Sequence, residues 1–199
     1  MLAQLRPALV MIVLFSALTG IAYPLAITGI AQLTFPGQAY GSLIERGGKI
    51  AGSALIGQNF SSDRYFHGRP SATTTPDPAD PSKTVDAPYN AANSSGSNLG
   101  PTSKKLVDRI GSAIAAGIEA GYTDPFLADA VTASASGLDP HISPGFAVAQ
   151  AETVAKARNL PLSKVQALIE AHIEPRSAGL FGEPRVNVLL LNLALDDVR

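Results

Sequence analysis

The side chains in this sequence that could do chemistry are concentrated between Thr132 and Pro144, in the stretch TASASGLDPHISP. Hydroxyl groups, a glycine and backbone N–H groups ahead of a helix start can together hold an anion such as a phosphate. The same composition is what a tight loop followed by a helix cap requires. On the residues alone we favour the tight loop over the anion site.

Three histidines, His67, His141 and His172, are the remaining candidates for acid–base or metal chemistry. Asp139 and His141 offer two metal ligands separated by a proline, with no third ligand nearby in the sequence, which is a weak pattern for a metal site. His67 lies in the aromatic and basic turn YFHGRP, where local packing is the simpler interpretation. We therefore expect hydrogen-bonded structural histidines and no metal ion.

Motifs of nucleotide and hydrolytic chemistry are missing from the sequence. Gly48-Lys49 is followed by Ile50, and Leu43 stands where a P-loop needs its first glycine. The G-x-G-x-x-G fingerprint, the Asp-Lys-Thr-Gly-Thr loop of P-type pumps, the G-x-S-x-G elbow and H-E-x-x-H do not occur either. The chain has no cysteine, which excludes thiolate chemistry. We expect a chain without catalytic residues of its own.

Composition narrows the class of protein further. The chain has 199 residues, of which 46% are hydrophobic, so one compact domain can form beside a membrane segment. The formal net charge is −1 and no basic block occurs, which disfavours nucleic acid as a partner. The 18 glycines and 15 prolines predict many loops and turns.

The elements that must position these residues begin with a membrane segment. No charged residue occurs between Arg6 and Glu45, and the 26 residues from Ala8 to Leu33 are almost wholly apolar. As a helix they reach about 39 Å, enough to cross a hydrocarbon core of about 30 Å with some tilt. We predict a single transmembrane helix at 8–33, kinked at Pro24.

The charges at the ends of this helix predict its orientation. Arg6 and the amino terminus are positive, which favours residues 1–7 in the cytoplasm and the domain at 34–199 outside the cell. The alternative is a signal peptide that is cleaved near Gly20-Ile21-Ala22. The apolar run continues to Leu33, past the point where such a peptide should end, so we favour the retained anchor.

One face of the anchor carries a stripe of small residues at intervals of four: Ser16, Gly20, Pro24 and Thr28. Small and weakly polar residues at this spacing let a second helix approach closely in lipid. The alternative is that small residues are common in membrane helices and that the hydroxyls bond to their own backbone. Under the first interpretation the stripe docks on partner helices.

The rest of the chain predicts one α+β domain, a small sheet covered by about three helices. Tyr40–Phe60 predicts a β-hairpin, with strands at Leu43-Ile44 and Ala54–Ile56 joined by a glycine turn. Residues 70–101 contain six prolines and few large apolar residues, which predicts a long surface loop without helix or strand.

Three helices and a terminal strand are expected beyond this loop. A four-residue apolar period predicts a helix over Lys104–Tyr122, ended by Thr123-Asp124-Pro125. Ser143-Pro144 should start a helix to about Asn159, and a capping box of Ser163 and Gln166 a helix from Lys164 to about Ile173. Pro184–Asp196 predicts a strand buried on both faces, although periodicity does not separate strand from helix in its last part.

Sequence blocks from one terminus to the other are those of a known family: RPAL at Arg6, YPL at Tyr23, GSALIGQNF at Gly52, YFHGRPSA at Tyr65, GSNLGP at Gly96, VTASASGLDPHISP at Val131, VAKARNL at Val154 and VNVLLLNLALD at Val186. In these blocks and in their order the whole chain resembles the C subunit of the Kdp-type potassium-transporting ATPase of bacteria. Residues 73–87 are longer and richer in proline than the family pattern.

The resemblance implies a non-catalytic accessory subunit of a high-affinity, ATP-driven potassium import complex in the bacterial plasma (inner) membrane. Its partners would be a channel-like potassium-translocating subunit, an ATP-hydrolysing P-type subunit and membrane lipid. The family reading adds a role as a catalytic chaperone that raises the affinity of the ATP-hydrolysing subunit for ATP. It implies no tightly bound cofactor and connects five residues with nucleotide: Thr132, Ser134, Ser136, Gly137 and Asp139.

The predicted topology bears on this picture, because a domain outside the cell does not meet cytoplasmic ATP. A role on the outer face of the channel-like subunit, with the stripe from Ser16 to Thr28 packed on its helices, agrees with both the predicted topology and the family resemblance. The alternative from another class is a membrane-tethered extracytoplasmic module that captures a ligand in the 70–101 loop. A tethered hydrolase is a third alternative, but no nucleophile–base pair can be named for it.

Overall fold

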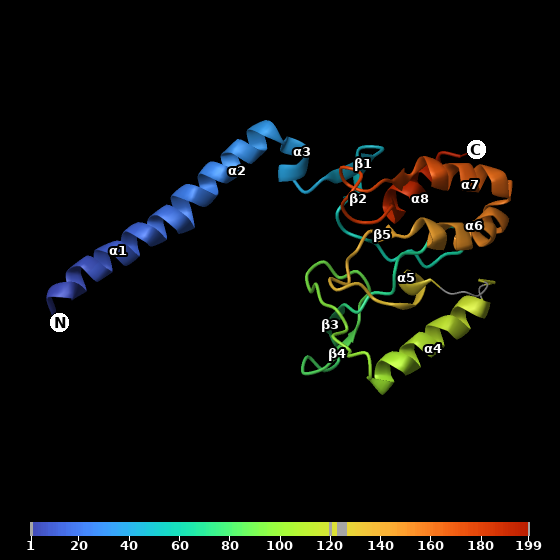
Figure 1. Cartoon of the computed structure of the whole chain (residues 1–199), viewed down its shortest axis with the longest axis horizontal. Coiled ribbons are helices and arrows are strands. Elements are labelled where there is room, and N and C mark those ends of the chain that lie inside the picture. Colours follow the sequence, from blue (N-terminus) through green and yellow to red (C-terminus); the bar gives the residue numbers. More distant parts are fainter. Residues whose placement is uncertain (1, 120, 123–126, 199) are drawn as a thin grey trace. The chain divides into compact units, whose positions relative to one another are not determined.

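The structure, a computed structural model, describes residues 2–119, 121–122 and 127–198 (Figure 1). The chain forms two compact units, Met1–Ser53 and Ala54–Arg199, each of which is described by itself. The predicted fold class is confirmed: a long apolar N-terminal helix is followed by mixed helices and small antiparallel sheets. Thr123-Asp124-Pro125, the expected end of the first domain helix, lie outside the described residues.

The first unit is dominated by one continuous helical stretch, Leu5–Thr34, whose 30 residues are apolar enough and long enough to cross a membrane. Its parts are η1 (Leu2–Gln4), α1 (Leu5–Ala17), the π-helical segment η2 (Leu18–Ala22) and α2 (Tyr23–Thr34), after which comes the short helix α3 (Pro36–Ala39). None of the described side chains of α1 or α2 is buried. An apolar helix with no protein partner of its own needs lipid or other helices around it.

A kink was predicted at Pro24, and the structure has a π-helical segment at Leu18–Ala22 just before it, within a helix that continues through the proline. In η2 the N–H of Tyr23 donates to the carbonyl of Leu18, five residues earlier. Pro24 has no N–H and its ring crowds the preceding turn, and a widened turn is one way for a helix to absorb this defect without breaking.

The predicted hairpin at the end of the first unit is confirmed, but its second strand lies earlier than expected. Strands β1 (Leu43–Arg46) and β2 (Lys49–Ser53) pair antiparallel, with Arg46 opposite Lys49. The turn is only Gly47-Gly48, whose φ angles of 59° and 75° are in the left-handed region. Because a two-residue turn brings the next residues directly into register, pairing begins at Lys49, and the predicted strand at Ala54–Ile56 is wrong.

The core of the second unit is built on a three-stranded antiparallel sheet in the order β5 (His141–Ile142), β7 (Arg185–Asn187) and β6 (Ile173–Glu174). Helices α6 (Pro144–Arg158), α7 (Leu162–Ala171) and α8 (Val188–Asp196) lie together beside it (Figure 1). The largest fully buried apolar side chains come from β5, α7, α8 and the loop at Phe66: Phe66, Ile142, Ile169, Leu191 and Leu195.

Two of the predicted helix starts have different outcomes. The hydroxyl of Ser143 accepts the N–H of Phe146 at 3.1 Å and Asn159 ends α6 in the left-handed conformation, so that prediction is confirmed. Helix α7 instead begins at Leu162, directly after Pro161. The capping box at Ser163 is therefore wrong, because the extended proline already sets the helix start and leaves Ser163 inside the first turn.

The terminal strand predicted for Pro184–Asp196 is correct only for β7, and the rest of it is the helix α8. The side chain of Asn187 accepts the N–H of Leu190 at 3.2 Å and so caps that helix. The apolar residues then follow a helical period, with Val188, Leu191 and Leu195 in the core. Burial of most of the helix surface, rather than of two strand faces, explains the nearly continuous apolar run.

The proline-rich segment 70–101 is mainly loop, but the expectation of no strand is wrong. Strands β3 (Thr74–Pro76) and β4 (Thr84–Asp86) form a short antiparallel hairpin inside it. Threonine and valine favour extended backbone, and Pro76 lies at the strand end where it disturbs little. The helix expected over Lys104–Tyr122 is α4 (Lys104–Glu119), and a single turn, α5 (Ala128–Val131), precedes the serine-rich stretch.

Candidate functional site

The serine-rich stretch is a loop between α5 and β5 that uses its hydroxyls to fix its own backbone. The Thr132 hydroxyl donates to the carbonyl of Ala128 at 2.6 Å. The Ser134 hydroxyl accepts the N–H of Gly137 at 2.9 Å, and the Ser136 hydroxyl accepts the N–H of Leu138 at 3.1 Å. These are local turn-forming bonds, as expected for a tight loop. Two of the N–H groups that an anion would need are therefore already occupied.

The same loop is held against the proline-rich segment by its carbonyl groups. The Ser71 hydroxyl donates to the carbonyl of Gly137 at 2.7 Å, and the Ser94 hydroxyl to that of Ser136 at 3.0 Å. Gly137 has a φ of +68°, and a Cβ at this position would lie 2.6 Å from the carbonyl oxygen of Ser95. Only glycine fits this contact, so the two loops form one layer.

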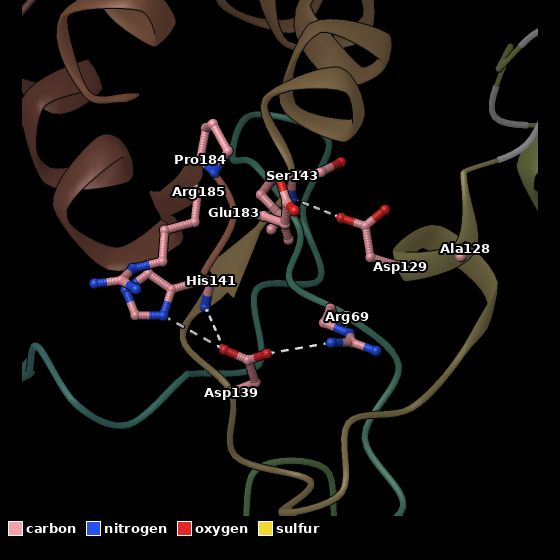
Figure 2. Close-up of a pocket in the computed structure, with 10 residues that line it drawn as sticks. Arg69, Ala128, Asp129, Asp139, His141, Ser143, Glu183, Pro184 and Arg185 are labelled. Atoms are coloured by element: carbon pink, nitrogen blue, oxygen red, sulfur yellow. Dashed lines mark hydrogen bonds and ion pairs between the residues drawn. The ribbon is translucent and has the colours of Figure 1, made fainter. Parts of the chain in front are cut away.

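A chain of polar side chains crosses the end of the sheet beside this loop, and Figure 2 shows its first part, Arg69, Asp139 and His141. Asp139 lies between Arg69, whose Nη1 is 3.3 Å from Oδ2, and His141, whose Nδ1 is 3.4 Å from Oδ1. On the other side of the imidazole, Nε2 of His141 is 3.9 Å from Oε2 of Glu174, which accepts a hydrogen bond from Nε of Arg185 at 2.9 Å. The chain thus ties a loop to strands β5, β6 and β7.

Arg69 and Asp139 both line two hollows. The first, of about 530 Å³, is lined by Asp129, His141, Ser143 and Arg185 among others (Figure 2). The second, of about 520 Å³, is lined by Ser134, Ser136 and Asp139 together with apolar residues around Leu55. Of the five residues connected with nucleotide, these three share one hollow. Thr132 instead contacts Arg69, with 3.4 Å between Oγ1 and Nη2, and Gly137 packs toward Thr73.

The three histidines make contacts that the sequence did not specify. A ring nitrogen of His67 lies 3.2 Å from the carbonyl oxygen of Ser62, and one of His172 lies 2.8 Å from that of Leu168. His141 contacts carboxylates instead. Within residues 2–119, 121–122 and 127–198, no three His, Asp or Glu side chains are grouped so that they could hold a metal ion.

The charge on Asp139 is stabilised by its neighbours. Burial on its own raises the pKa of this carboxyl group, but hydrogen bonds from His141 and the positive charge of Arg69 outweigh burial. The net result is a pKa below the ordinary value of 3.8. A carboxyl group whose pKa is lowered on folding stabilises the fold above its unfolded pKa, and this stabilisation is lost as the pH falls through the folded pKa.

We therefore expect Asp139→Asn to lower the free energy of unfolding at neutral pH. The free energy of unfolding of the variant should also fall less steeply as the pH is lowered. The amide cannot carry the charge that Arg69 and His141 stabilise, so the variant has one proton-linked group fewer. The measurement is urea unfolding of the purified chain at pH values from 7 down to 3. Asp108→Asn, in an exposed pair with Lys104 on α4, is the matched control and should change little. An acid profile identical to that of the unmodified chain would contradict the assignment.

Two buried amide side chains that sequence reasoning missed hold the segment that carries Arg69. Asn192 accepts the N–H of Phe66 at 2.8 Å and donates to its carbonyl at 2.9 Å. Gln150 accepts the N–H of His67 at 2.7 Å and donates to its carbonyl at 3.1 Å. Both amides are only 1% exposed. They satisfy the backbone N–H and carbonyl groups that a neighbouring strand would otherwise satisfy. The available signal was an asparagine inside the apolar run VLLLNLAL.

Tyr89 was also missed, and it fixes the backbone of Arg69 directly. Its hydroxyl donates to the carbonyl of Arg69 at 2.7 Å. Burial, with a smaller effect from the charge of Asp139, raises the pKa of Tyr89 to about 12, so the phenol stays protonated and able to donate. A Cβ at Gly57 or Gly68 would lie 2.4 or 2.2 Å from the Tyr89 side chain. Nothing in the local sequence pairs Gly57 or Gly68 with a tyrosine that lies 32 or 21 residues further along the chain.

In the first unit, the π segment affects the small-residue stripe. Residues four apart in an α-helix are offset by about 40°, so a stripe of four such residues drifts by about 120°. A π turn rotates less per residue and takes up part of this drift. The segment Leu18–Ala22 lies in the middle of the stripe, so helix geometry predicts that it brings Ser16 and Gly20 closer in line with Pro24 and Thr28.

Comparison with known proteins identifies the family. The family described as "KdpC: K+-transporting ATPase, c chain" matches residues 5–197. The chain belongs to the KdpC family. It is 59% identical to the potassium-transporting ATPase KdpC subunit of Bradyrhizobium diazoefficiens over 196 residues, 98% of each chain. The KdpC subunit of Methylorubrum extorquens is 58% identical to it over 100% of this chain and 98% of its own. The KdpC subunit of Rhodopseudomonas palustris is also 58% identical, over 98% of each chain.

Membership confirms the family resemblance from one end of the chain to the other. A KdpC chain is a subunit of the K⁺-transporting ATPase complex, so other Kdp subunits are its partners and the complex it joins is a membrane ATPase. The apolar helix Leu5–Thr34 is long enough to anchor this KdpC chain in that membrane.

Proposed function

We propose that this KdpC chain is a non-catalytic accessory subunit that assembles and stabilises an ATP-driven potassium importer. The observation that carries the proposal is the family match over nearly the whole chain, residues 5–197. The site geometry agrees with it, because the charged and hydroxyl groups around Asp139 are engaged with one another and fix loops and strands. Such a surface is suited to presenting a rigid shape to a neighbouring protein.

The proposed partners are the channel-like potassium-translocating subunit and the ATP-hydrolysing P-type subunit. The helix Leu5–Thr34 lies in the plasma membrane with its amino terminus in the cytoplasm, and the stripe from Ser16 to Thr28 packs on helices of the channel-like subunit. The second unit then lies outside the cell on the outer face of that subunit. A reporter fused after Asp197 should be accessible from outside intact cells, and protection of that reporter would contradict this arrangement.

We propose further that any increase in ATP affinity caused by this chain is transmitted through the complex and not by direct contact. Ser134 and Ser136 already accept backbone N–H groups, and Asp139 is negative and paired with Arg69. A nucleotide phosphate in this hollow would have to displace those bonds and approach a carboxylate. Equilibrium dialysis of the isolated chain with ATP should show no saturable binding, whereas the assembled complex should bind ATP more tightly with the chain than without it.

Co-purification is the main test of the proposed function. The tagged chain, extracted in mild detergent, should bring multi-spanning subunits with it, and K⁺-stimulated ATPase activity should be present in the assembly and absent from the chain alone. Recovery of a monomer with a small ligand retained would instead support a tethered ligand-binding module.

The stripe predicts a specific effect on this assembly. Gly20→Leu should lower recovery of the other subunits about tenfold, because a branched side chain on the stripe keeps the partner helix at a distance. Gly29→Leu, in the same helix but outside the stripe, is the matched control; both glycines have open space around them in the isolated chain, so neither change should disturb the helix itself. Equal recovery with both variants would remove the stripe from the docking surface.

A further inference from the structure

The turn between β6 and β7 carries the most exposed large apolar side chains of the second unit. Leu180 is 77% exposed and Phe181 is 72% exposed, more than any other large apolar side chain described between Ala54 and Val198. They are adjacent at the tip of a turn with the sequence RSAGLFGE, residues 176–183. Two neighbouring apolar side chains that protrude from a soluble domain are typical of a contact with another molecule.

The turn is held rigid by its own hydrogen bonds. Ser177 and Phe181 form an antiparallel bridge in which each N–H donates to the other carbonyl, at 2.9 and 3.0 Å. The φ angles of Ala178, Gly179 and Gly182 are 52°, 73° and 77°. Ala178 adopts a left-handed conformation that is strained for an alanine. A preformed tip loses little conformational entropy on binding, which favours an anchor role.

The charges around the tip are balanced. Nη2 of Arg176 is 2.5 Å from Oε2 of Glu183, and Arg185 is paired with Glu174. Because Arg176 and Arg185 are each paired with a glutamate, these two arginines offer no unpaired positive charge to the anionic headgroups of a bilayer. An apolar pair inside a ring of matched charges resembles the centre and rim of a protein–protein interface.

The tip is also continuous with the charged hollow described above. Glu183, Pro184 and Arg185, which follow the tip directly, line the 530 Å³ hollow together with Asp129 and Ser143 (Figure 2). A partner that receives the tip therefore also reaches this hollow, where polar side chains of the partner find both acidic and basic groups.

We propose that Leu180 and Phe181 insert into an apolar socket on another subunit of the K⁺-transporting ATPase, with the charged hollow as the polar side of the same interface. The occupant is a protein surface rather than lipid, because the charges beside the tip cancel and the family is that of a subunit. The inference rests on the proposed role in assembly and names the part of the domain that performs it.

The first experiment compares two pairs of substitutions in the full chain. Leu180→Ser with Phe181→Ser removes the tip, and Val107→Ser with Ile118→Ser removes two exposed apolar side chains of α4 that are 62% and 61% exposed. After detergent extraction and dilution, the tip variant should retain about tenfold less of the other subunits, as loss of an aromatic anchor does at protein interfaces. The α4 variant should retain as much as the unmodified chain, and both should unfold at the same temperature as it does.

The outcomes separate this inference from the proposed function. If the unmodified chain retains no other subunit, the assembly role fails. If it retains them and the tip variant retains them equally, only the role of the tip fails. A lower unfolding temperature for the tip variant would show that the turn is structural, and this too would overturn the inference.

A second experiment identifies what the tip contacts. Phe181 is replaced by the photoreactive residue benzoylphenylalanine in the assembled complex in membranes, and Ile118 is replaced in the same way as a control. Illumination should link position 181 to another subunit at least about tenfold more than position 118. An adduct with lipid, an adduct with a second copy of the chain, or no adduct at position 181 would each contradict the proposal.

Discussion

Replacing Gly137 by alanine should destabilise the second unit by about 3 kcal/mol. The new Cβ would lie 2.6 Å from the carbonyl oxygen of Ser95 and 2.6 Å from Cγ2 of Thr73. The φ of +68° adds strain for any residue with a Cβ. The contact is with backbone on one side, so a change of rotamer cannot relieve it. Urea unfolding of the purified chain, followed by the near-ultraviolet circular dichroism of its tyrosines, measures the loss.

Gly100→Ala is the matched control for this prediction. Gly100 is exposed, and a Cβ there meets nothing within 4 Å, so its free energy of unfolding should stay within about 0.5 kcal/mol of the unmodified chain. Hydrogen exchange adds a local measurement: in Gly137→Ala the N–H groups of Leu138 and Gly57, which bond in or to this loop, should exchange faster. A Gly137→Ala chain as stable as the Gly100→Ala chain would show that the two loops are not pressed together as described.

Asn192→Ala should lower the free energy of unfolding by a similar amount, about 3 kcal/mol, for a different reason. The substitution leaves both the N–H and the carbonyl of Phe66 without the partners they have at 2.8 and 2.9 Å. The side chain of Phe66 is fully buried, so water does not readily replace the lost bonds. Gln150→Ala should act in the same way on His67. The expected result is a lower urea midpoint with an unchanged slope.

Asn93→Ala is the comparison for the asparagine prediction. Asn93 also donates to a backbone carbonyl, that of Thr74, at 2.9 Å, but it is exposed. Water can replace that bond, so the loss should be below about 0.5 kcal/mol. If Asn192→Ala were no more destabilising than Asn93→Ala, the segment at Phe66 would not depend on the amide for its position.

The parts of the fold that sequence predicted correctly are those with local causes. The helix α6 follows from Ser143-Pro144 at its start and Asn159 at its end, and the hairpin in the first unit from Gly47-Gly48. The error in the C-terminal segment has a non-local cause. The run from Val188 to Leu195 is helical because most of its surface is buried among other elements. The spacing of its apolar residues in the sequence does not reveal this burial.

The candidate site shows the same limit. The serine-rich loop could be located, and its hydroxyls were expected to shape a tight turn. Its partners could not be foreseen, because Arg69, Tyr89 and Asp139 are brought together by contacts across 20 to 70 residues of chain. The positions of Gly57 and Gly68 against the Tyr89 ring depend on the same tertiary contacts. The residues alone predicted a membrane anchor and no catalytic centre, and only the family resemblance supplied a specific expectation about potassium transport.

The widened turn before Pro24 has a further consequence for a lone copy of the chain in a membrane. Proline brings no amide proton, so one main-chain oxygen of the preceding turn lacks its helical donor, and the hydrocarbon around it contains no water to solvate it. Gly20 in that turn has no side chain to shield it, which leaves the backbone open to a neighbour. A neighbouring helix that donates a hydroxyl or amide proton there would lower the free energy of the anchor. The assembled chain is therefore more stable in the bilayer than an unassembled copy.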